Sequence, residues 1–223
     1  MSDALPRSEP YPSFDAFFTR PLRDGARSPS ADAVVSPADG TLVSSGPVDP
    51  GARLFVKGRP YDVADLVGDP RDAPRYAGGQ FAVVYLAPRD YHRVHSPVDG
   101  RIDLVRSMPG DLFPVNRVGE RHVPRLLVRN QRVAIYITTE GLGRVAVVMV
   151  GAVIVGRISV RGIPGRDVPP GEHMLDPPLG VNKGDEIGVF HLGSTVVLLL
   201  EPGTIVARPP GTIQVGATLL SVQ

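Results

Sequence analysis

The segment VFHLGSTVVLLL, residues 189–200, is a long apolar run interrupted by one small step, Gly193-Ser194-Thr195. Aliphatic and β-branched residues on both sides of the step predict a strand buried on both faces. Glycine weakens a strand, and buried hydroxyl groups cost free energy unless they find hydrogen-bond partners. Something must offset this cost, so the step is a candidate functional position within a β-rich core.

The rest of the chain has the composition of a mainly β protein. The 25 glycines and 24 prolines among 223 residues disfavour long helices and favour frequent turns. Short β-branched runs between these turns predict strands at residues 81–86, 132–138, 145–150, 152–160, 195–200 and 218–222. We therefore expect a mainly β fold of the α+β class, a small β-barrel or sandwich with a few short peripheral helices.

A short helix is predicted near the N-terminus in SFDAFFTRPL. Ser13 is a suitable N-cap, Phe14, Phe17 and Phe18 follow helical spacing, and Pro21 should end the helix. We interpret residues 1–28 as an N-terminal arm with this short amphipathic helix, which packs on the core or, alternatively, contacts a membrane surface. Residues 29–223 are expected to form a single domain, with a second short helix at residues 63–67.

A weak internal repeat connects two parts of the chain. SPADGTL at residues 36–42 recurs as SPVDGRI at residues 96–102. Asp-Gly between apolar runs is a strong signal for a tight turn. The repeat therefore predicts a fold of duplicated hairpins, and PPGTI at residues 209–213 is expected to begin a third.

The composition also argues against several classes of function. A formal net charge of +1 gives no broad cationic surface, so nucleic acid is not an expected partner. The absence of cysteine excludes disulfides, thiolate zinc sites and a cysteine nucleophile. The only lysines, Lys57 and Lys183, each precede a glycine and are expected at hairpin edges, so pyridoxal phosphate is not an expected cofactor.

The same residues bear on location in the cell. No apolar run approaches the roughly 20 residues of a spanning helix. The N-terminal residues lack the apolar region of a secretory signal. We expect a cytoplasmic protein without a transmembrane helix, which could still touch a membrane surface.

Two histidines share the segment RDYHRVHSPVDG, namely His92 and His95. Residues three apart in a strand face opposite sides, so a bend is needed before both can line one site. One alternative is a metal site completed by a carboxylate, but no third ligand follows at a recognisable spacing and no metal is expected. The other is a nucleophile with a base and an acid, namely Ser194, His95 and either Asp39 or Asp99. The alternative interpretation of each aspartate is a turn former without a catalytic role.

Taken together, these segments resemble phosphatidylserine decarboxylases, which are self-processing enzymes that use a pyruvoyl group. The resemblance is carried, in family order, by FDAFFTRPLRDGARSP, VSPADGTLVSSG, YLAPRDYHRVHSPVDG and NKGDEIGVFHLGSTVVLLLEPG, from about residue 14 to 203. It implies that Asp39, in the Pro-x-Asp-Gly block, is the catalytic acid, and that Asp99 is a turn former. It likewise implies that His95, the second histidine of His-Arg-x-His, is the base, and that Ser194, in Leu-Gly-Ser-Thr, is the nucleophile.

The resemblance also implies a self-cleavage reaction. With His95 as general base oriented by Asp39, the Ser194 hydroxyl attacks the carbonyl of Gly193 and converts the peptide into an ester. β-Elimination then separates a β chain (residues 1–193) from an α chain (residues 194–223), whose dehydroalanine hydrolyses to a pyruvoyl group with loss of ammonia. This group, derived from Ser194, is the implied cofactor, and it withdraws electrons as carbon dioxide leaves the substrate. Either His92 or His95 would then return a proton.

The implied activity is conversion of phosphatidylserine to phosphatidylethanolamine and carbon dioxide at the inner face of the cell membrane. The α and β chains are expected to stay together as a heterodimer, and such heterodimers to pair into a homodimer. Few residues precede the Phe-Phe-x-Arg-Pro-Leu block, so we expect membrane contact through residues 14–22 or through exposed apolar loops. The alternatives are a pyruvoyl decarboxylase of a soluble amino acid or phosphoserine-like substrate, a serine hydrolase that does not cleave itself, and a β-hairpin binding module.

Overall fold

The structure, a computed structural model, describes residues 3–115, 117–153, 157–191, 194–206 and 208–222. The helices are α1 (Phe14–Phe18), α2 (Val63–Val67), α3 (Ala73–Tyr76), α4 (Arg117–His122) and α5 (Leu126–Arg129). The strands are β1 (Val34–Val35), β2 (Gly40–Pro47), β3 (Arg53–Val56), β4 (Arg59–Asp62), β5 (Gln80–Leu86), β6 (Arg93–His95), β7 (Gly100–Met108), β8 (Arg132–Thr138), β9 (Arg144–Val150), β10 (Ile158–Val160), β11 (Gly171–Val181), β12 (Glu186–Phe190), β13 (Ser194–Leu200), β14 (Thr204–Val206), β15 (Gly211–Ile213) and β16 (Thr218–Val222).

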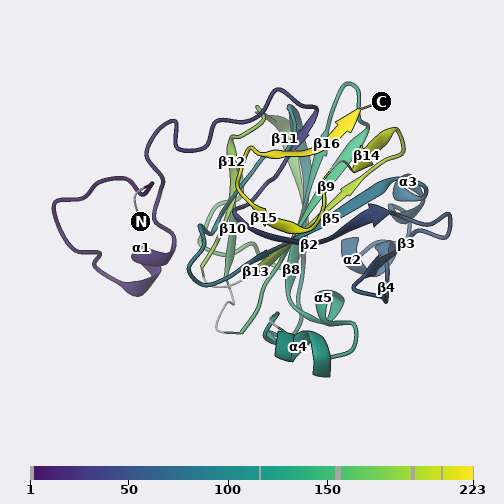
Figure 1. Ribbon diagram of the computed structural model, residues 1–223, viewed down its shortest axis with the longest axis horizontal. Coiled ribbons are helices and arrows are strands. Elements are labelled where there is room, and N and C mark those ends of the chain that lie inside the picture. The colour runs from purple at the N-terminus through teal and green to yellow at the C-terminus, as the bar shows by residue number, and fades with distance from the viewer. Residues whose placement is uncertain (1–2, 116, 154–156, 192–193, 207, 223) are drawn as a thin grey trace.

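An eight-stranded antiparallel sheet dominates the fold, with the strand order β11-β7-β8-β9-β13-β5-β2-β15 (Figure 1). β13 lies inside this sheet, and its Thr195 pairs with Tyr85 of β5 on one side and with Val150 of β9 on the other. All seven residues of β13 are buried, as a strand covered on both faces requires. The predicted mainly β fold is confirmed, but the described strands leave this sheet open at β11 and β15 and do not close a barrel.

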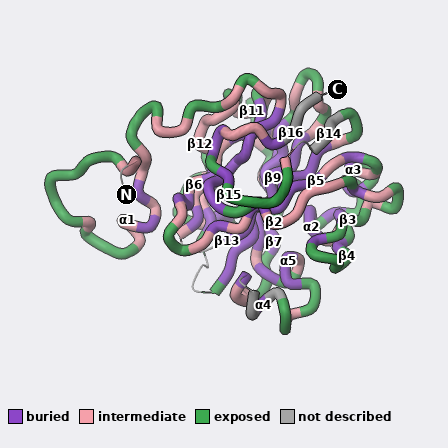
Figure 2. Tube along the Cα trace, viewed as in Figure 1, coloured by how far each residue is buried: buried purple, intermediate pink, exposed green. Residues whose placement is uncertain are grey.

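The two faces of the sheet pack against different layers. Along β13, Val196 and Leu198 point into one core cluster, and Val197 and Leu199 point into a second. The first cluster includes residues of β6, β10, β12, β1 and β16, so we call this side of the sheet the first face. The second cluster includes residues of α2, α3 and the β3–β4 hairpin, which define the second face. Figure 2 shows the buried strands at the centre and the more exposed N-terminal arm at the side.

Most predicted strands occur where the β-branched runs lie, at β5, β8, β9, β13 and β16. The prediction of a strand over residues 152–160 is confirmed at Ile158–Val160, which forms β10, and is wrong at residues 152, 153 and 157; residues 154–156 lie outside the described residues. The segment 189–200 is not one strand either. β12 ends at Phe190 and β13 begins at Ser194, because the chain passes here from a three-stranded sheet into the eight-stranded one. Both strands are buried, so the hydropathy does not reveal the break.

The two Asp-Gly repeats are not hairpin turns, and the prediction of duplicated hairpins is wrong on this point. β1 pairs with β16, and β2 pairs with β5 and β15, so the strands flanking the first repeat do not pair with each other. The second repeat likewise connects β6, which pairs with β12, to β7 in the large sheet. The third candidate, at residues 209–213, supplies β15, which pairs with β2.

The repeats instead form two similar bends that hydrogen-bond to each other. The His95 amide donates to the Pro37 carbonyl at 2.8 Å, and the Val35 amide donates to the Pro97 carbonyl at 3.0 Å. Glycine follows the aspartate because the strand there passes close to its neighbour: a Cβ atom on Gly40 would lie 2.2 Å from the carbonyl oxygen of Tyr85. The duplication seen in the sequence is therefore a pair of matched sheet-to-sheet connections.

The predicted helices are confirmed at residues 14–18 and 63–67. The Ser13 hydroxyl caps α1 by accepting a hydrogen bond from the Ala16 amide at 3.1 Å. Phe18 is buried, whereas Phe14 is 62% exposed. Over the part of the chain that the structure describes, no helix is long and apolar enough to cross a membrane.

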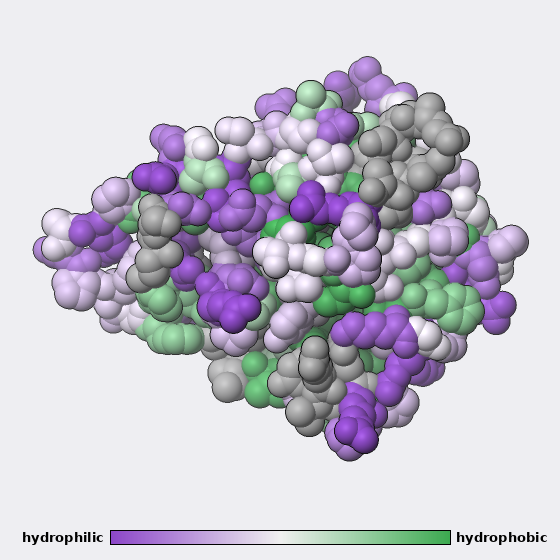
Figure 3. Space-filling view, in the orientation of Figure 1, coloured by the Kyte–Doolittle hydropathy of each residue, from purple (hydrophilic) through white to green (hydrophobic). Residues whose placement is uncertain are grey.

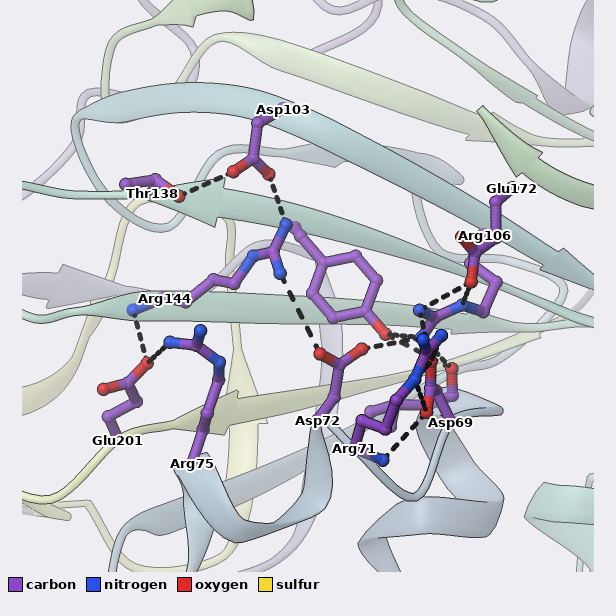
Figure 4. Close-up of polar contacts among 12 residues, drawn as sticks. Asp69, Arg71, Asp72, Arg75, Asp103, Arg106, Thr138, Arg144, Glu172 and Glu201 are labelled. Carbon is purple, nitrogen blue, oxygen red and sulfur yellow. Dashed lines mark hydrogen bonds and ion pairs between the residues drawn. The ribbon is translucent and has the colours of Figure 1, made fainter. Parts of the chain in front are cut away.

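A buried polar network holds α2 and α3 on the second face of the sheet (Figure 4). The Arg106 side chain is almost fully buried and forms ion pairs with Asp72 at 2.8 Å and Asp69 at 3.3 Å. Arg144 of β9 pairs with Asp103 of β7 at 2.8 Å, across the intervening strand β8. Buried charges of this kind need partners on every side, and the network therefore fixes how the helices sit on the sheet.

Candidate active site

Ser194 occupies the first position of β13, opposite Leu86 of β5. Its side chain has no exposed surface, and among the described residues its hydroxyl oxygen has no hydrogen-bond partner. An unsatisfied buried hydroxyl costs roughly 1–3 kcal/mol, so natural proteins rarely keep one without a use. Strand alternation directs this side chain to the first face, the side to which Val196 and Leu198 also point. Gly193, the other half of the predicted cleavage site, lies outside the described residues.

His95 is held through both of its ring nitrogens. Nδ1 lies 2.7 Å from the Gly184 carbonyl oxygen, and Nε2 lies 3.0 Å from the Tyr91 hydroxyl. A carbonyl can only accept, so Nδ1 carries the proton and the unprotonated Nε2 accepts from Tyr91. Burial lowers the pKa of His95, and the Gly184 contact and the carboxylates of Glu186 and Asp39 oppose this in part. The ring is therefore neutral at pH 7, with the basic nitrogen at Nε2.

Asp39 lies close to this histidine but is bonded to other groups. Its carboxylate accepts hydrogen bonds from Arg27, the shortest at 2.6 Å, and from the Val215 amide at 2.8 Å. The Asp39 hydrogen bond raises the pKa of Arg27. In the structure the contact that orients the His95 ring is thus the Gly184 carbonyl, and Asp39 acts on His95 through its charge.

The structure distinguishes the two aspartates of the repeat by their surroundings. Asp99 accepts from the Lys183 amide at 2.7 Å, as Asp39 accepts from the Val215 amide. However, Asp39 is only 8% exposed and bears an arginine partner, whereas Asp99 is exposed. At equivalent positions of the two repeats, the charge of the buried Asp39 can therefore act on the site, whereas the exposed Asp99 is suited to forming a turn.

His92 is fully buried and is held through one nitrogen. Nδ1 lies 2.9 Å from the Asp90 carbonyl oxygen and must donate to it, while Nε2 has no hydrogen-bond partner in the part of the chain that the structure describes. The Phe18 ring of α1 packs on the imidazole with ring centroids 3.8 Å apart. Burial lowers the pKa of His92 to about 4. This leaves a neutral imidazole with an unused lone pair in an apolar environment.

Strand pairing places His92 and His95 at opposite ends of β12. The Phe190 amide donates to the His92 carbonyl at 3.0 Å, so His92 lies at the end of β12 that leads into β13. His95 pairs with Glu186 at the opposite end of β12. His92 precedes β6 and His95 is the last residue of β6, so the two histidines do not belong to one strand.

The N-terminal arm covers this region. The imidazole of His191, shortly before Ser194 in the chain, donates from Nδ1 to the Asp15 carboxylate at 2.9 Å, and Arg166 forms an ion pair with the same carboxylate. Arg93 donates to the Thr19 carbonyl at 2.8 Å. The arm thus packs on the residues that flank the site, as the first of its two predicted roles required.

Sequence reasoning missed Arg27, Tyr91 and Gly184. Tyr91 lies in the same motif as the two histidines, which was a usable signal. Arg27 lies within the first quoted motif and only 12 residues before Asp39, whereas nothing local indicated that Gly184 would reach His95, because that contact spans 89 residues. Among the residues described, no group of three or more histidine or acidic side chains is arranged to hold a metal ion.

Comparison with known proteins agrees with this geometry. The family model for phosphatidylserine decarboxylase matches residues 14–221. The chain belongs to the phosphatidylserine decarboxylase family. It is therefore an enzyme of the carboxy-lyase class, and the resemblance stated from the sequence motifs is confirmed.

Relatives in this family align over most of the chain. The phosphatidylserine decarboxylase proenzyme of Anaeromyxobacter sp. (strain K) is 42% identical over 226 residues, which cover 96% of this chain and 80% of the relative. The proenzyme of Acinetobacter baumannii (strain ATCC 17978) is 44% identical over 198 residues, covering 87% and 69% of the two chains. That of Shewanella baltica (strain OS155) is 42% identical over 224 residues, covering 95% and 76%.

Proposed function

We propose that the chain cleaves itself between Gly193 and Ser194 and then decarboxylates phosphatidylserine to phosphatidylethanolamine. The observation that carries this proposal is the buried, unpartnered hydroxyl of Ser194 at the start of a central strand. The proenzyme names of the relatives support processing of the precursor. A serine at this position also fits the pyruvoyl group, because it supplies the atoms from which that group is made.

In the precursor, Nε2 of His95 exchanges its Tyr91 contact for the Ser194 hydroxyl and removes the hydroxyl proton. The serine oxygen then attacks the carbonyl carbon of Gly193, and the amide nitrogen takes the proton from His95 as the C–N bond breaks, which leaves an ester. Loss of the Cα proton of residue 194 breaks the C–O bond and frees the carboxylate of Gly193. Water then displaces ammonia from residue 194 and leaves a ketone there.

Burial supports this assignment of base. Because the pKa of His95 is lowered, the ring is unprotonated at Nε2 without needing a high pH. Burial raises the pKa of Tyr91, which keeps its hydroxyl protonated, so Tyr91 can donate to Nε2 but does not compete as a base. The ion pair with Arg27 fixes the position of the Asp39 carboxylate.

In the processed enzyme, residue 194 would hold the pyruvoyl group, which would supply a carbonyl that withdraws electrons as carbon dioxide leaves. Nε2 of the neutral His92 accepts no hydrogen bond from the described residues, so this nitrogen is free to contact the reacting part of the substrate. Because burial lowers its pKa, the imidazole in its protonated form gives up a proton readily to the substrate carbon. Among the two candidates, His92 is favoured for this step because its Nε2 has no other partner.

The two chains stay together in this proposal because the α chain contributes β13, which hydrogen-bonds to β5 and β9 of the β chain. Breaking one peptide bond leaves these ladders intact. Pairing of the heterodimers into a homodimer, and peripheral attachment in the cytoplasm at the inner face of the cell membrane, stay predictions. The 62% exposure of Phe14 supports contact between the arm and a lipid surface.

Intact mass spectrometry tests the processing step. Freshly purified protein should give two fragments divided between Gly193 and Ser194, and a hydrazide reagent should label the C-terminal fragment. Ser194→Ala and His95→Ala should remain uncut and unlabelled. Asp39→Asn should process far more slowly, whereas the matched Asp99→Asn variant, altered at the equivalent place in the repeat, should process normally.

The alternatives predict other results. A serine hydrolase that does not cleave itself, or a β-hairpin binding module, would remain a single unlabelled chain. A processed enzyme that releases carbon dioxide from free serine or phosphoserine but not from phosphatidylserine vesicles would keep the pyruvoyl chemistry and overturn the lipid substrate.

A further inference from the structure

A recess on the second face of the sheet lies next to the proposed cofactor position. It has a volume of about 310 Å³ and is enclosed by the sheet, the β3–β4 hairpin and the α4–α5 segment. Apolar side chains line it, among them Val43, Val83 and Leu126. Figure 3 shows hydrophobic surface in a hollow in the lower right of the molecule, with strongly hydrophilic side chains beside it.

The lining of this recess combines apolar surface with positive charge. The exposed side chains of Lys57, Arg59 and Arg121 line it. Arg59 donates to the main-chain carbonyls of Arg121 at 3.3 Å and Val123 at 3.5 Å, which ties the hairpin to the α4–α5 segment. Lysine and arginine are the side chains that bind phosphate oxygens most strongly. An apolar interior with a cationic mouth suits an amphipathic molecule that carries a phosphate.

The recess also borders the residue next to the reacting residue 194. Thr195 lines it, and Thr195 directly follows Ser194. Consecutive Cα atoms are about 3.8 Å apart, and the ketone carbon of the processed enzyme is the former Cα of residue 194. The substrate can therefore approach this main-chain atom from the second face, while His92 and His95 lie with the elements that cover the first face. In phosphatidylserine only a few bonds separate the amine from the phosphate, so an amine at residue 194 places the phosphate inside the recess.

Resting on the proposed function, we infer that this recess binds the glycerophosphate and the first acyl carbons of the phospholipid substrate. Lys57 and Arg121 contact the phosphate, and the apolar side chains around Val43 receive the start of the acyl chains. This assignment makes the recess the part of the enzyme that selects a phospholipid over free serine. Such a site gains affinity from the cationic contacts to the phosphate and from the apolar contacts to the acyl carbons. This combination is typical of ligand pockets, which are mostly apolar with a few convergent polar groups.

The test compares three serine-bearing substrates with the processed enzyme: dihexanoyl-phosphatidylserine, glycerophosphoserine and O-methylserine, which keeps the free amine and carboxylate but has no phosphate. The Lys57→Gln/Arg121→Gln double variant should raise KM at least tenfold for the two phosphate-bearing substrates and leave KM for O-methylserine unchanged. Val43→Phe, which fills the recess, should raise KM for the dihexanoyl lipid more than for glycerophosphoserine. Arg101→Gln removes an exposed positive charge from β7, which does not line the recess, and is the matched control.

Mass and hydrazide labelling, measured on every variant, separate the possible failures. If the parent chain is uncut and unlabelled, the proposed function fails before the recess is tested. If the parent is processed and active but the double variant keeps the parent KM for glycerophosphoserine, the assigned phosphate contacts are wrong. If Val43→Phe does not process, the parent alone decides: a KM for the dihexanoyl lipid no lower than that for glycerophosphoserine overturns the acyl site.

Discussion

The buried imidazole of His92 predicts how the stability of the protein depends on pH. Burial lowers its pKa from 6.5 to about 4 in the folded protein. The unfolded chain therefore takes up a proton as the pH falls below about 6.5, while the folded protein does not until about pH 4. The stability that depends on a neutral His92 is thus fully present above pH 6.5, declines between pH 6.5 and about pH 4, and is lost below about pH 4.

The magnitude follows from the size of the shift. One pKa unit corresponds to about 1.4 kcal/mol, so the complete loss amounts to about 3 kcal/mol. The linkage relation gives a free energy of unfolding that is about 2 kcal/mol lower at pH 5 than at pH 7.5. This decrease is a large fraction of the stability of an ordinary domain.

Urea denaturation of the uncut Ser194→Ala chain at pH 7.5, 6.5 and 5 measures this effect, since a single covalent chain allows reversible unfolding. His92→Gln is neutral at every pH and its amide can still donate to the Asp90 carbonyl. The variant should lose about 2 kcal/mol less than its parent between pH 7.5 and 5. His173→Gln, which removes a histidine that contacts the Pro169 carbonyl on the surface, should follow the parent. Parallel pH profiles for His92→Gln and the parent would refute the burial argument.

Two further predictions concern the support of the site. Arg27→Met leaves the buried Asp39 carboxylate without its cation and should lower the free energy of unfolding by about 3 kcal/mol, and adding Asp39→Asn should restore part of the loss in the same urea measurement. Gly40→Ala places a Cβ atom 2.2 Å from the Tyr85 carbonyl oxygen and should lower the melting temperature by more than 10 °C in thermal circular dichroism, whereas Gly141→Ala, with no atom within 4 Å, should melt like the parent. An Arg27→Met chain as stable as its parent, or equal melting of the two alanine variants, would contradict the respective argument.

Local sequence patterns were sufficient for most of the secondary structure. The run from Arg132 to Thr138 predicts the first and last residues of β8 correctly, because β-branched residues bounded by polar ones carry the signal within the strand itself. Ser13 predicts the start of α1 for the same reason, since a cap acts on residues three positions away. The family could likewise be identified from motifs, because each motif is a short contiguous block.

The partners of these elements could not be read in the same way. The Asp-Gly repeats have the local pattern of hairpin turns, yet each connects strands of two different sheets. An alternating or apolar run specifies that a residue is buried, but not which strand covers it. The segment 189–200 therefore appeared continuous, although Phe190 and Ser194 belong to different sheets.

The sequence by itself determined the strand-rich composition of this protein, the first helix and the membership in the phosphatidylserine decarboxylase family, because all of these depend on neighbouring residues. Only the tertiary structure decided that Asp39 is buried beside Arg27 while Asp99 is exposed, that the Gly184 carbonyl orients His95, and that a cationic recess opens beside Thr195. These features arise where segments far apart in the chain meet, and the free energy of such contacts depends on burial and distance rather than on local sequence.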